Sequence, residues 1–318
     1  HSQLGRRSLA LRYHRLAPGR VARVSTPTFI PTRAVAEYFS KRGYALYASP
    51  TLYPGQTLRA RVQADEANPG PVQCNLYIQV YGAEDQLVIR RGEAVRLAAG
   101  AAHEFVWPIT GPGNEPIASV GVELSHHRRA DGAVYLDYLT WDGEPALVLQ
   151  RPEHKGEMWR MAWVDALDQY NPRWPEAFRL VQNEGRGLLI QGTREWRNYS
   201  ASTVLTPHLV KTAGIAARVQ GMQRFYGLLL CADQHVRLIK ALDGDQILAE
   251  ARLEWQLGEP VALELQVSGT TLRASVNGHE LFQVDDRLHP LEGGAVALVC
   301  EEGRVATDQV IIHPATQS

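Results

Sequence analysis

Two parts of the chain combine aromatic and guanidinium side chains that could bind a sugar, and in the first part these side chains follow the alternating pattern of a β-strand. In the first half, the residues on the polar side of two predicted strands are Arg59, Arg61, Asn75, Tyr77 and Gln79. In the second half, the corresponding set is Trp196, Tyr199, Arg218, Arg224 and Tyr226. Aromatic rings stack on the apolar face of a sugar ring, while Arg, Asn and Gln hydrogen-bond to its hydroxyl groups. Both sets are therefore candidate carbohydrate-binding residues.

Each set also has a purely structural interpretation, and the sequence leaves both open. The first set would equally form the polar exterior of an amphipathic sheet that a neighbouring domain covers. In the second set, we expect Trp196 or Tyr226 to lie partly in the core, because large aromatic residues dominate sandwich interiors.

Catalytic chemistry is less well represented. Glycoside hydrolysis needs two carboxylates roughly 5–10 Å apart across the sugar bond. The nearest acidic pair on one predicted strand, Glu250 and Glu254, has no Asp between its members. The motifs G-x-S-x-G, H-E-x-x-H, the P-loop and G-x-G-x-x-G are absent. We therefore expect no catalytic residues in this chain. If it is an enzyme, we expect a glycosyl hydrolase, with an unfamiliar site near Trp159, Asp165 and Asp168.

Two adjacent histidines could in principle ligate a metal. His126 and His127 are followed by Arg128 and Arg129, and the sequence points to no further ligands. We therefore interpret this segment as an exposed basic loop.

The stretch Val261–Val284 sets the fold class. In Val261–Val267 every second residue is Val or Leu, which marks a strand with one buried and one wetter face. Ser268-Gly269 and Asn277-Gly278 then supply two tight turns, because Asn and Gly tolerate positive φ. The segment is predicted to be an antiparallel meander.

The turn lengths also predict which residues pair in this meander. A two-residue turn at Ser268-Gly269 would pair Leu265 with Leu272 and keep the apolar residues on one face. In the third strand Leu281 and Phe282 would face opposite sides, so a bulge or a two-sided strand is needed there.

The rest of the chain shows the same short, turn-bounded apolar segments. In the first half, predicted strands are Ser8–Arg12, Arg20–Val24, Tyr44–Ala48, Gln56–Ala64, Asn75–Tyr81, Glu93–Leu97, His103–Trp107, Ile117–Leu124 and Val134–Trp141. In the second half they are Leu188–Gln191, Ser200–Leu205, Gly214–Gln220, Phe225–Cys231, His235–Ala241, Gln246–Trp255, the meander, Ala295–Cys300 and Val305–His313. Strands at this spacing predict an all-β protein of two tandem antiparallel β-sandwiches. We place the first at residues 1–150 and the second at 151–318, with a short Trp-rich connecting segment after residue 150.

Composition excludes several classes of partner. The 33 basic and 34 acidic residues nearly cancel, so nothing suggests a nucleic acid or membrane partner. The three cysteines form no metal or disulfide pattern, which favours a reduced, cytoplasmic location. The chain begins at His1 rather than Met, which predicts that it is a piece of a longer protein.

The second half resembles the concanavalin A-like and laminin-G-like jelly rolls. The features that carry this resemblance are Trp196 with Tyr199, the strand end Arg218–Gly221, Arg224–Tyr226 and the hairpin Val276–Gly278. The first half, closed by LDYLTWDGEP (Leu136 to Pro145), is similar to galactose-binding-like jelly rolls. The tandem as a whole resembles the non-catalytic C-terminal region of some bacterial ADP-ribosylglycohydrolase-family proteins.

This resemblance implies several properties. Both jelly-roll families often carry a structural Ca²⁺ on a late-strand carboxylate, which makes Asp137 and Asp308 candidate ligands, although no cofactor is required. Catalytic members of the laminarinase-like branch carry E-x-D-x-(x)-E on one strand, and this chain has no such run. The sequence therefore predicts a non-catalytic module that binds a carbohydrate or a sugar-bearing ligand and is attached to an upstream, hydrolytic domain. A purely structural or assembly module is the alternative.

Overall fold

A computed structural model describes residues 7–31, 49–111, 113, 115–170 and 174–315. The described chain is all-β, as predicted, and its only helical elements are the single turns η2 (Ala83–Asp85) and α2 (Met158–Met161). Neither is long enough to span a bilayer, and no membrane-crossing helix occurs among the described residues. The predicted strand Tyr44–Ala48 lies outside them.

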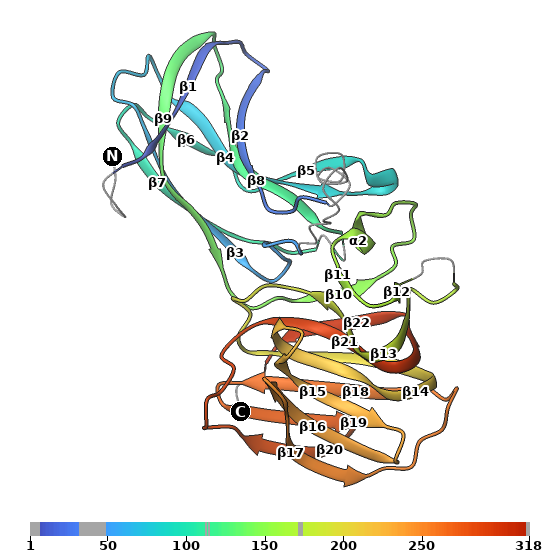
Figure 1. Ribbon diagram of the computed structural model, residues 1–318. Coiled ribbons are helices and arrows are strands. Elements are labelled where there is room, and N and C mark those ends of the chain that lie inside the picture. The colour runs from blue at the N-terminus through green and yellow to red at the C-terminus, as the bar shows by residue number, and fades with distance from the viewer. Residues whose placement is uncertain (1–6, 32–48, 112, 114, 171–173, 316–318) are drawn as a thin grey trace. The chain divides into compact units, whose positions relative to one another are not determined.

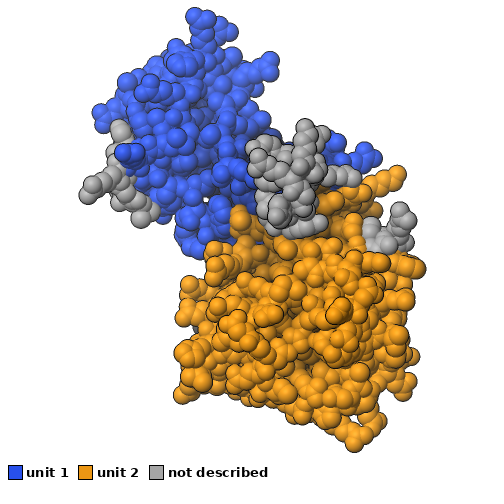
Figure 2. Space-filling model, in the orientation of Figure 1, with its two compact units in different colours: residues 1–30, 52–143 blue, residues 31–51, 144–318 orange. Residues whose placement is uncertain are grey.

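The chain divides into two compact units, coloured separately in Figure 2: residues 1–30 with 52–143, and residues 31–51 with 144–318. The predicted boundary at residue 150 comes after strand β10 (Leu147–Gln150) in the chain. This strand pairs with β22 (Gln309–Pro314) and so belongs to the second unit. The structure therefore places the change of unit at Gly143, before β10.

The first unit is a sandwich of two antiparallel sheets (Figure 1). One sheet has the order β1-β9-β3-β7, and the other has the order β2-β8-β4-β5 with β6 also on β4. Their bounds are β1 Leu9–Leu16, β2 Val21–Pro27, β3 Thr57–Ala64, β4 Val72–Tyr81, β5 Leu87–Arg91, β6 Val95–Leu97, β7 Ala102–Pro108, β8 Ile117–Ser125 and β9 Ala130–Asp142.

The core of this unit lies between the two sheets. Every second residue of β3, from Leu58 to Ala64, and of β4, from Val72 to Val80, is buried there. This confirms the inner faces that the alternation predicted for both strands. Removing these apolar surfaces from water supplies the main stabilisation of the sandwich, at roughly 25 cal/mol per Å².

The second unit is organised by one unusually long strand, β14 (Tyr199–Gly221). Its first third pairs with β18 and β22, whereas its second half pairs with β15 and β21. The same strand therefore runs through two sheets, β10-β22-β14-β18-β19-β20 and β13-β21-β14-β15-β16-β17. The other bounds are β11 Val164–Ala166, β12 Gln169–Tyr170, β13 Phe178–Gln191, β15 Arg224–Cys231, β16 His235–Leu242, β17 Asp245–Arg252, β18 Val261–Ser268, β19 Thr271–Val276, β20 His279–Asp285 and β21 Ala295–Thr307.

The sequence predicted two strands, Ser200–Leu205 and Gly214–Gln220, where β14 is continuous. Within the stretch between them lies Pro207, which cannot donate a ladder hydrogen bond. In the structure the pairing of β14 with β21 shifts register between Pro207 and Val210. The proline thus lies at the irregularity where the strand passes from one sheet to the other. A bulge of this kind bends a strand without ending it.

The meander is confirmed, with one change of register. Asn277 (φ 50°) and Gly278 (φ 79°) form the second turn as predicted. The first turn is Gly269-Thr270, so Leu265 pairs with Ala274 and not with Leu272. Both registers keep the apolar residues on one face, which is why alternation alone could not separate them.

The irregular third strand of the meander is also confirmed. The pairing of β19 with β20 shifts between Ala274 and Ser275. This shift leaves Leu281 as the extra residue and lets Phe282 face the core, where it is buried.

The Trp-rich connecting segment contains a helical turn and a short strand. A single helical turn, α2, is followed directly by the opening strand β11, which pairs with β13. Trp159, Trp163 and Tyr170 pack around Phe178 at the start of β13, with ring centroids 5.1–6.2 Å apart. These aromatic rings close one end of the second unit.

We predict that the crossing of β14 depends on Gly303. A Cβ at this position (φ 154°) would lie 1.9 Å from the Leu209 carbonyl oxygen, so one of the two strands must move. Gly303→Ala should reduce the free energy of unfolding by about 4 kcal/mol or more in urea denaturation. Gly258→Ala is the matched control, since its φ is also positive (85°) but nothing lies within 4 Å, and it should cost about 1 kcal/mol. Equal losses in the two variants would contradict the role of Gly303.

Candidate functional site

The structure separates the candidate residues of the first unit. Arg59 and Arg61 lie on β3, and Asn75, Tyr77 and Gln79 lie on β4, which belongs to the opposite sheet. Their outward faces therefore point to opposite sides of the sandwich. The five side chains do not form one binding surface.

On β3 the two arginines pair with acids of the neighbouring strand β9. Arg59 Nε lies 3.2 Å from Asp142 Oδ2, and an Arg61 guanidinium nitrogen lies 3.8 Å from Asp137 Oδ2. The Asp137 side chain is nearly fully buried. These contacts give the arginines a role in joining β3 to β9.

On β4 the polar residues are covered. Asn75 and Tyr77 are buried, and the Gln79 side chain accepts a hydrogen bond of 2.7 Å from the Ser119 hydroxyl. The Tyr77 ring lies against Gly121 of the adjacent strand, where a Cβ would approach the ring to 2.8 Å. Asn75 and Tyr77 therefore offer almost no accessible surface to a ligand.

Beside them, Glu123 on β8 is held between two arginines that the sequence did not single out. Its carboxylate accepts hydrogen bonds from Arg23 Nε at 2.5 Å and from Arg91 Nε at 2.8 Å, and its side chain is 6% exposed. Burial acts to raise the pKa of Glu123, but the hydrogen bonds and charges of Arg91 and Arg23 outweigh burial and lower it.

We predict that this carboxylate makes the stability of the first unit depend on pH. Because the folded-state pKa is depressed, the stabilisation is present above the ordinary glutamate pKa of 4.5 and is lost as the pH falls through the folded value. Glu123→Gln should cost about 2 kcal/mol at pH 7, and its deficit in Tm should shrink in melts at pH 3.5. The exposed Glu93 is the control, because Glu93→Gln should give no such trend. A deficit that is constant from pH 3.5 to 7 would be contrary to this account.

The candidate residues of the second unit lie almost entirely in its core. Trp196, Tyr199, Arg218 and Tyr226 are each at most 1% exposed, and only Arg224 is at the surface. We expected Trp196 or Tyr226 to lie partly in the core, and both are fully buried. Side chains without accessible surface cannot contact a ligand, so we do not assign these four to a binding site.

Their polar atoms form an internal network instead. The Arg218 guanidinium donates to the carbonyl oxygens of Arg197, Gly269 and Leu291 at 2.6–3.0 Å, and its backbone N–H donates to the Tyr199 hydroxyl. Burial lowers the pKa of Arg218. The Tyr226 hydroxyl donates to Asp286, which also pairs with the buried Lys240 at 2.8 Å. The network ties β14 to the loop between β20 and β21.

We predict that replacing Arg218 affects folding. Arg218→Met removes the donor from the buried Leu291 carbonyl and from the part-buried carbonyls of Arg197 and Gly269. It should cost about 3 kcal/mol or more in chemical denaturation. Arg224→Met, at an exposed position on β15, should stay within about 0.5 kcal/mol of the wild type. A fully stable Arg218→Met protein would argue against the network.

The two acids of the alternative hydrolytic site serve the backbone. The Asp168 carboxylate accepts from the backbone and side-chain nitrogens of Asn183 at 2.7 and 2.9 Å, and Asp165 accepts from the Leu167 N–H. Burial raises the pKa of Asp165. The Asp168 contacts lie at the register shift of β13, and the hydrogen bond of Asp165 is with the backbone of its own segment.

The basic loop differs partly from expectation. His127 is exposed, but His126 is buried and stacks on it with ring centroids 5.0 Å apart. No group of three metal-ligating side chains occurs in the part of the chain that the structure describes.

The two calcium candidates have other contacts. Asp137 has Arg61 as its charged neighbour, and Asp308 accepts the Ala177 backbone N–H at 3.0 Å. A Ca²⁺ ion takes six to eight oxygen ligands. The positively charged Arg61 guanidinium beside Asp137 supplies no such ligand and repels a cation. Calcium binding at these positions stays a prediction, which Tm measured in EDTA and in CaCl₂ would test.

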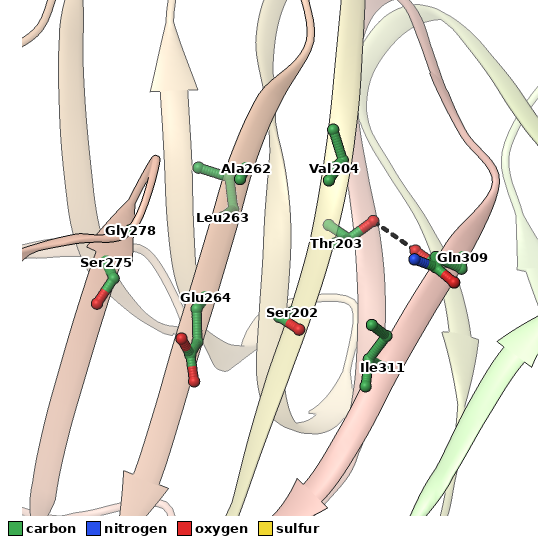
Figure 3. Close-up of a pocket in the computed structure, with 10 residues that line it drawn as sticks. All are labelled: Ser202, Thr203, Val204, Ala262, Leu263, Glu264, Ser275, Gly278, Gln309 and Ile311. Atoms are coloured by element: carbon green, nitrogen blue, oxygen red, sulfur yellow. Dashed lines mark hydrogen bonds between the residues drawn. The ribbon is translucent and has the colours of Figure 1, made fainter.

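A groove on the outer face of the second unit brings together a different set of polar residues. It crosses four neighbouring strands, β22, β14, β18 and β19, and encloses about 220 Å³ (Figure 3). We call it the serine groove, defined by its lining residues Ser202, Thr203, Val204, Ala262, Leu263, Glu264, Ser275, Gly278, Gln309 and Ile311.

The strand register explains how these residues meet. Ser202 pairs with Ile311 on one side and with Glu264 on the other, and Glu264 pairs with Ser275. These four side chains form one row across the sheet, all on the face opposite the core. Because the serine side chains are short, the row is hollow between Ile311 and Glu264.

The polar groups of the groove are held in place from the sides and from below. Ser200, one position further along the same face of β14, donates to Glu264 Oε1 at 2.5 Å. The buried Thr203 hydroxyl donates to the Gln309 backbone carbonyl at 2.7 Å (Figure 3). Val204, which is 46% exposed, gives the groove an apolar wall. The groove thus offers hydroxyl, carboxylate and amide groups beside apolar surface.

The sequence analysis did not single out this site. Ser200, Ser202 and Val204 lie on the outer side of a predicted strand, and Glu264 on the outer side of another, but serine carries no distinctive signal. One signal could have identified them. The strand that contains Ser200 and Ser202 has small polar residues on its outer side, and it pairs with the first strand of the meander.

Comparisons with known proteins give only a distant likeness. No protein-family model and no curated protein matches the chain. Among solved structures, it is similar to the carbohydrate-binding module CBM66 from Bacillus subtilis, with 12% identity and a TM-score of 0.43 over 48% of this chain and 94% of that one. A galectin-like protein of unknown function from Bacillus subtilis gives 12% identity and a TM-score of 0.43, over 51% and 94%. Sheep galectin-11 is 17% identical, with a TM-score of 0.30 over 41% of this chain and 98% of that one. None of these comparisons supports the resemblance to ADP-ribosylglycohydrolase-family proteins, which stays a prediction.

Proposed function

We propose that this chain is a carbohydrate-binding module and that the serine groove is its binding site. The observation that carries the proposal is the row Ser202, Glu264 and Ser275, three side chains with hydrogen-bonding capacity on adjacent strands around a hollow on the outer face. The outer face of an antiparallel sheet is commonly solvated, and a hollow lined by polar side chains distinguishes this part of it.

The spacing of the row suits a sugar. Neighbouring strands lie about 4.8 Å apart, and alternate residues of one strand about 7 Å apart, which is the scale of a single sugar ring. A serine hydroxyl both donates and accepts, and a carboxylate accepts from two hydroxyls at once. Val204, Ala262 and Ile311 can contact the C–H face of the same ring. A volume of about 220 Å³ is below the roughly 300–1,000 Å³ typical of pockets for drug-sized ligands, so the groove would hold one or two sugar units.

The groove favours binding over bond cleavage. Glu264 is the one carboxylate among its lining residues, and both glycosidase mechanisms need a pair of acids. We therefore propose recognition without turnover. Attachment of this module to an upstream hydrolytic domain, which the resemblance implies, is part of the proposal and is tested by the sequence of the complete gene product.

We predict that filling the hollow abolishes binding. On a glycan array the wild-type chain should be retained by at least one saccharide, and Ser202→Leu should weaken that retention at least tenfold, because the larger side chain occupies the space of the ring. Glu264→Ala should weaken it by about one to two orders of magnitude, through loss of charge-assisted hydrogen bonds.

The matched control is Glu254→Ala, which removes another exposed carboxylate outside the groove and should bind as the wild type does. Unchanged melting temperatures would show that Ser202→Leu is folded. Absence of retention on every saccharide would contradict the proposal and favour a structural or assembly module. Retention that survives Ser202→Leu would place the sugar elsewhere.

A further inference from the structure

The second unit has an exposed tryptophan, Trp174, that is not among the residues lining the serine groove. Trp174 is 44% exposed and is the one aromatic residue among the large apolar side chains that are exposed in the described parts of the chain. Burying apolar surface stabilises a fold by roughly 25 cal/mol per Å², so the exposed part of the Trp174 ring contributes nothing of this kind. The other aromatic residues of the connecting segment, Trp159 and Trp163, are buried.

One face of the Trp174 ring has a fixed neighbour. The Arg179 guanidinium carbon lies 4.4 Å from the ring centroid, which is the geometry of a cation–π contact. Arg179 is held in turn by Glu176, with a guanidinium nitrogen 2.6 Å from Glu176 Oε1. The ring is therefore supported from behind, and its exposure belongs to the opposite face and the edge.

The backbone that carries this ring is equally well held. The Arg151 guanidinium donates to three successive carbonyl oxygens, those of Trp174, Pro175 and Glu176, at 2.8–3.2 Å. The next residue, Ala177, donates its N–H to Asp308 at 3.0 Å. One guanidinium and one carboxylate thus fix four consecutive residues before β13 begins.

An exposed ring on a rigid support is a preorganised surface for stacking. A loop that served only as a connection would gain nothing from a clamp of this kind around an exposed Trp. Binding by such a surface costs little ordering entropy, because the ring is already oriented.

We propose that Trp174 is a second carbohydrate site, which stacks its open face on a neutral, gluco-configured pyranose ring. All ring substituents of such a sugar are equatorial, so its C–H bonds point to the two flat faces and meet the negative face of an aromatic ring. One exposed ring is enough surface for one sugar, whereas protein partners generally use a contiguous apolar patch of several hundred Å². The inference deepens the proposed function but does not use the serine groove.

Tryptophan fluorescence of the full chain tests this site, with cellohexaose as the probe. We expect cellohexaose to shift the wild-type emission to the blue as the exposed ring loses water. Trp174→Ala should abolish the shift and weaken binding at least tenfold by calorimetry, while Trp174→Phe, which keeps a flat ring, should weaken it less. Leu288→Ala, which removes another exposed apolar side chain, is the matched control and should behave as the wild type.

The result is separable from that of the groove. Ser202→Leu should leave the fluorescence shift intact, whether or not the groove binds sugar. A shift that persists in Trp174→Ala, or a wild-type chain that binds neither cellohexaose nor any other glucose oligosaccharide, would overturn the Trp174 site. Loss of binding in Ser202→Leu alone would assign the sugar to the groove. A fall in the Tm of Trp174→Ala by more than about 3 °C would also count against the proposal, because it would show that the ring is needed for the fold.

Discussion

The second unit depends on one strand that has to serve two sheets. β14 pairs on both sides near its start, with β18 and β22, and again in its second half, with β15 and β21. The passage between the sheets occurs where Gly303 of β21 lets the Leu209 carbonyl approach closely. Because every other strand of the sandwich is positioned from β14, this crossing decides which residues face the core and which face outward.

The crossing also accounts for the buried polar network. At the far end of β14, Arg218 adopts a left-handed backbone conformation (φ 50°), and its guanidinium turns into the unit. There it satisfies carbonyl oxygens of three separate segments. Burying a cation is costly unless it is hydrogen-bonded, and the four guanidinium hydrogen bonds of Arg218 join loops that no sheet ladder reaches. The residues that we propose for recognition are outside this network: Ser202 on the outer face of β14, and the exposed Trp174.

The sequence was sufficient for the class of fold and for much of its detail. Strict alternation in β3, β4 and β18 identified the inner faces correctly, and the conflict at Leu281 and Phe282 predicted a bulge that the structure contains. These features are local, so a single chain segment determines them. The continuity of β14 was missed, because the residues between Leu205 and Gly214 were not predicted as strand, and this is where β14 passes from one set of partner strands to the other.

The candidate sites were harder to predict, because alternation does not reveal what covers a face. Tyr77 and Asn75 lie on the outer side of β4, as predicted, yet they are buried. Tyr199 and Tyr226 were selected for their chemistry, but large aromatic side chains also fill cores most effectively. The serine groove depends on the register of four strands from distant parts of the chain, and no pattern within one strand contains that information.

The central claim is that the second unit holds a sugar against the outer face of the sheet formed by β22, β14, β18 and β19. The most direct measurement is a crystal structure of the chain soaked with the saccharide that retains it most strongly on a glycan array. The account predicts a sugar ring over Ser202 and Ser275, with its hydroxyls within hydrogen-bond distance of Glu264. A ring bound at another surface, with the serine groove empty at saturating sugar, would contradict it.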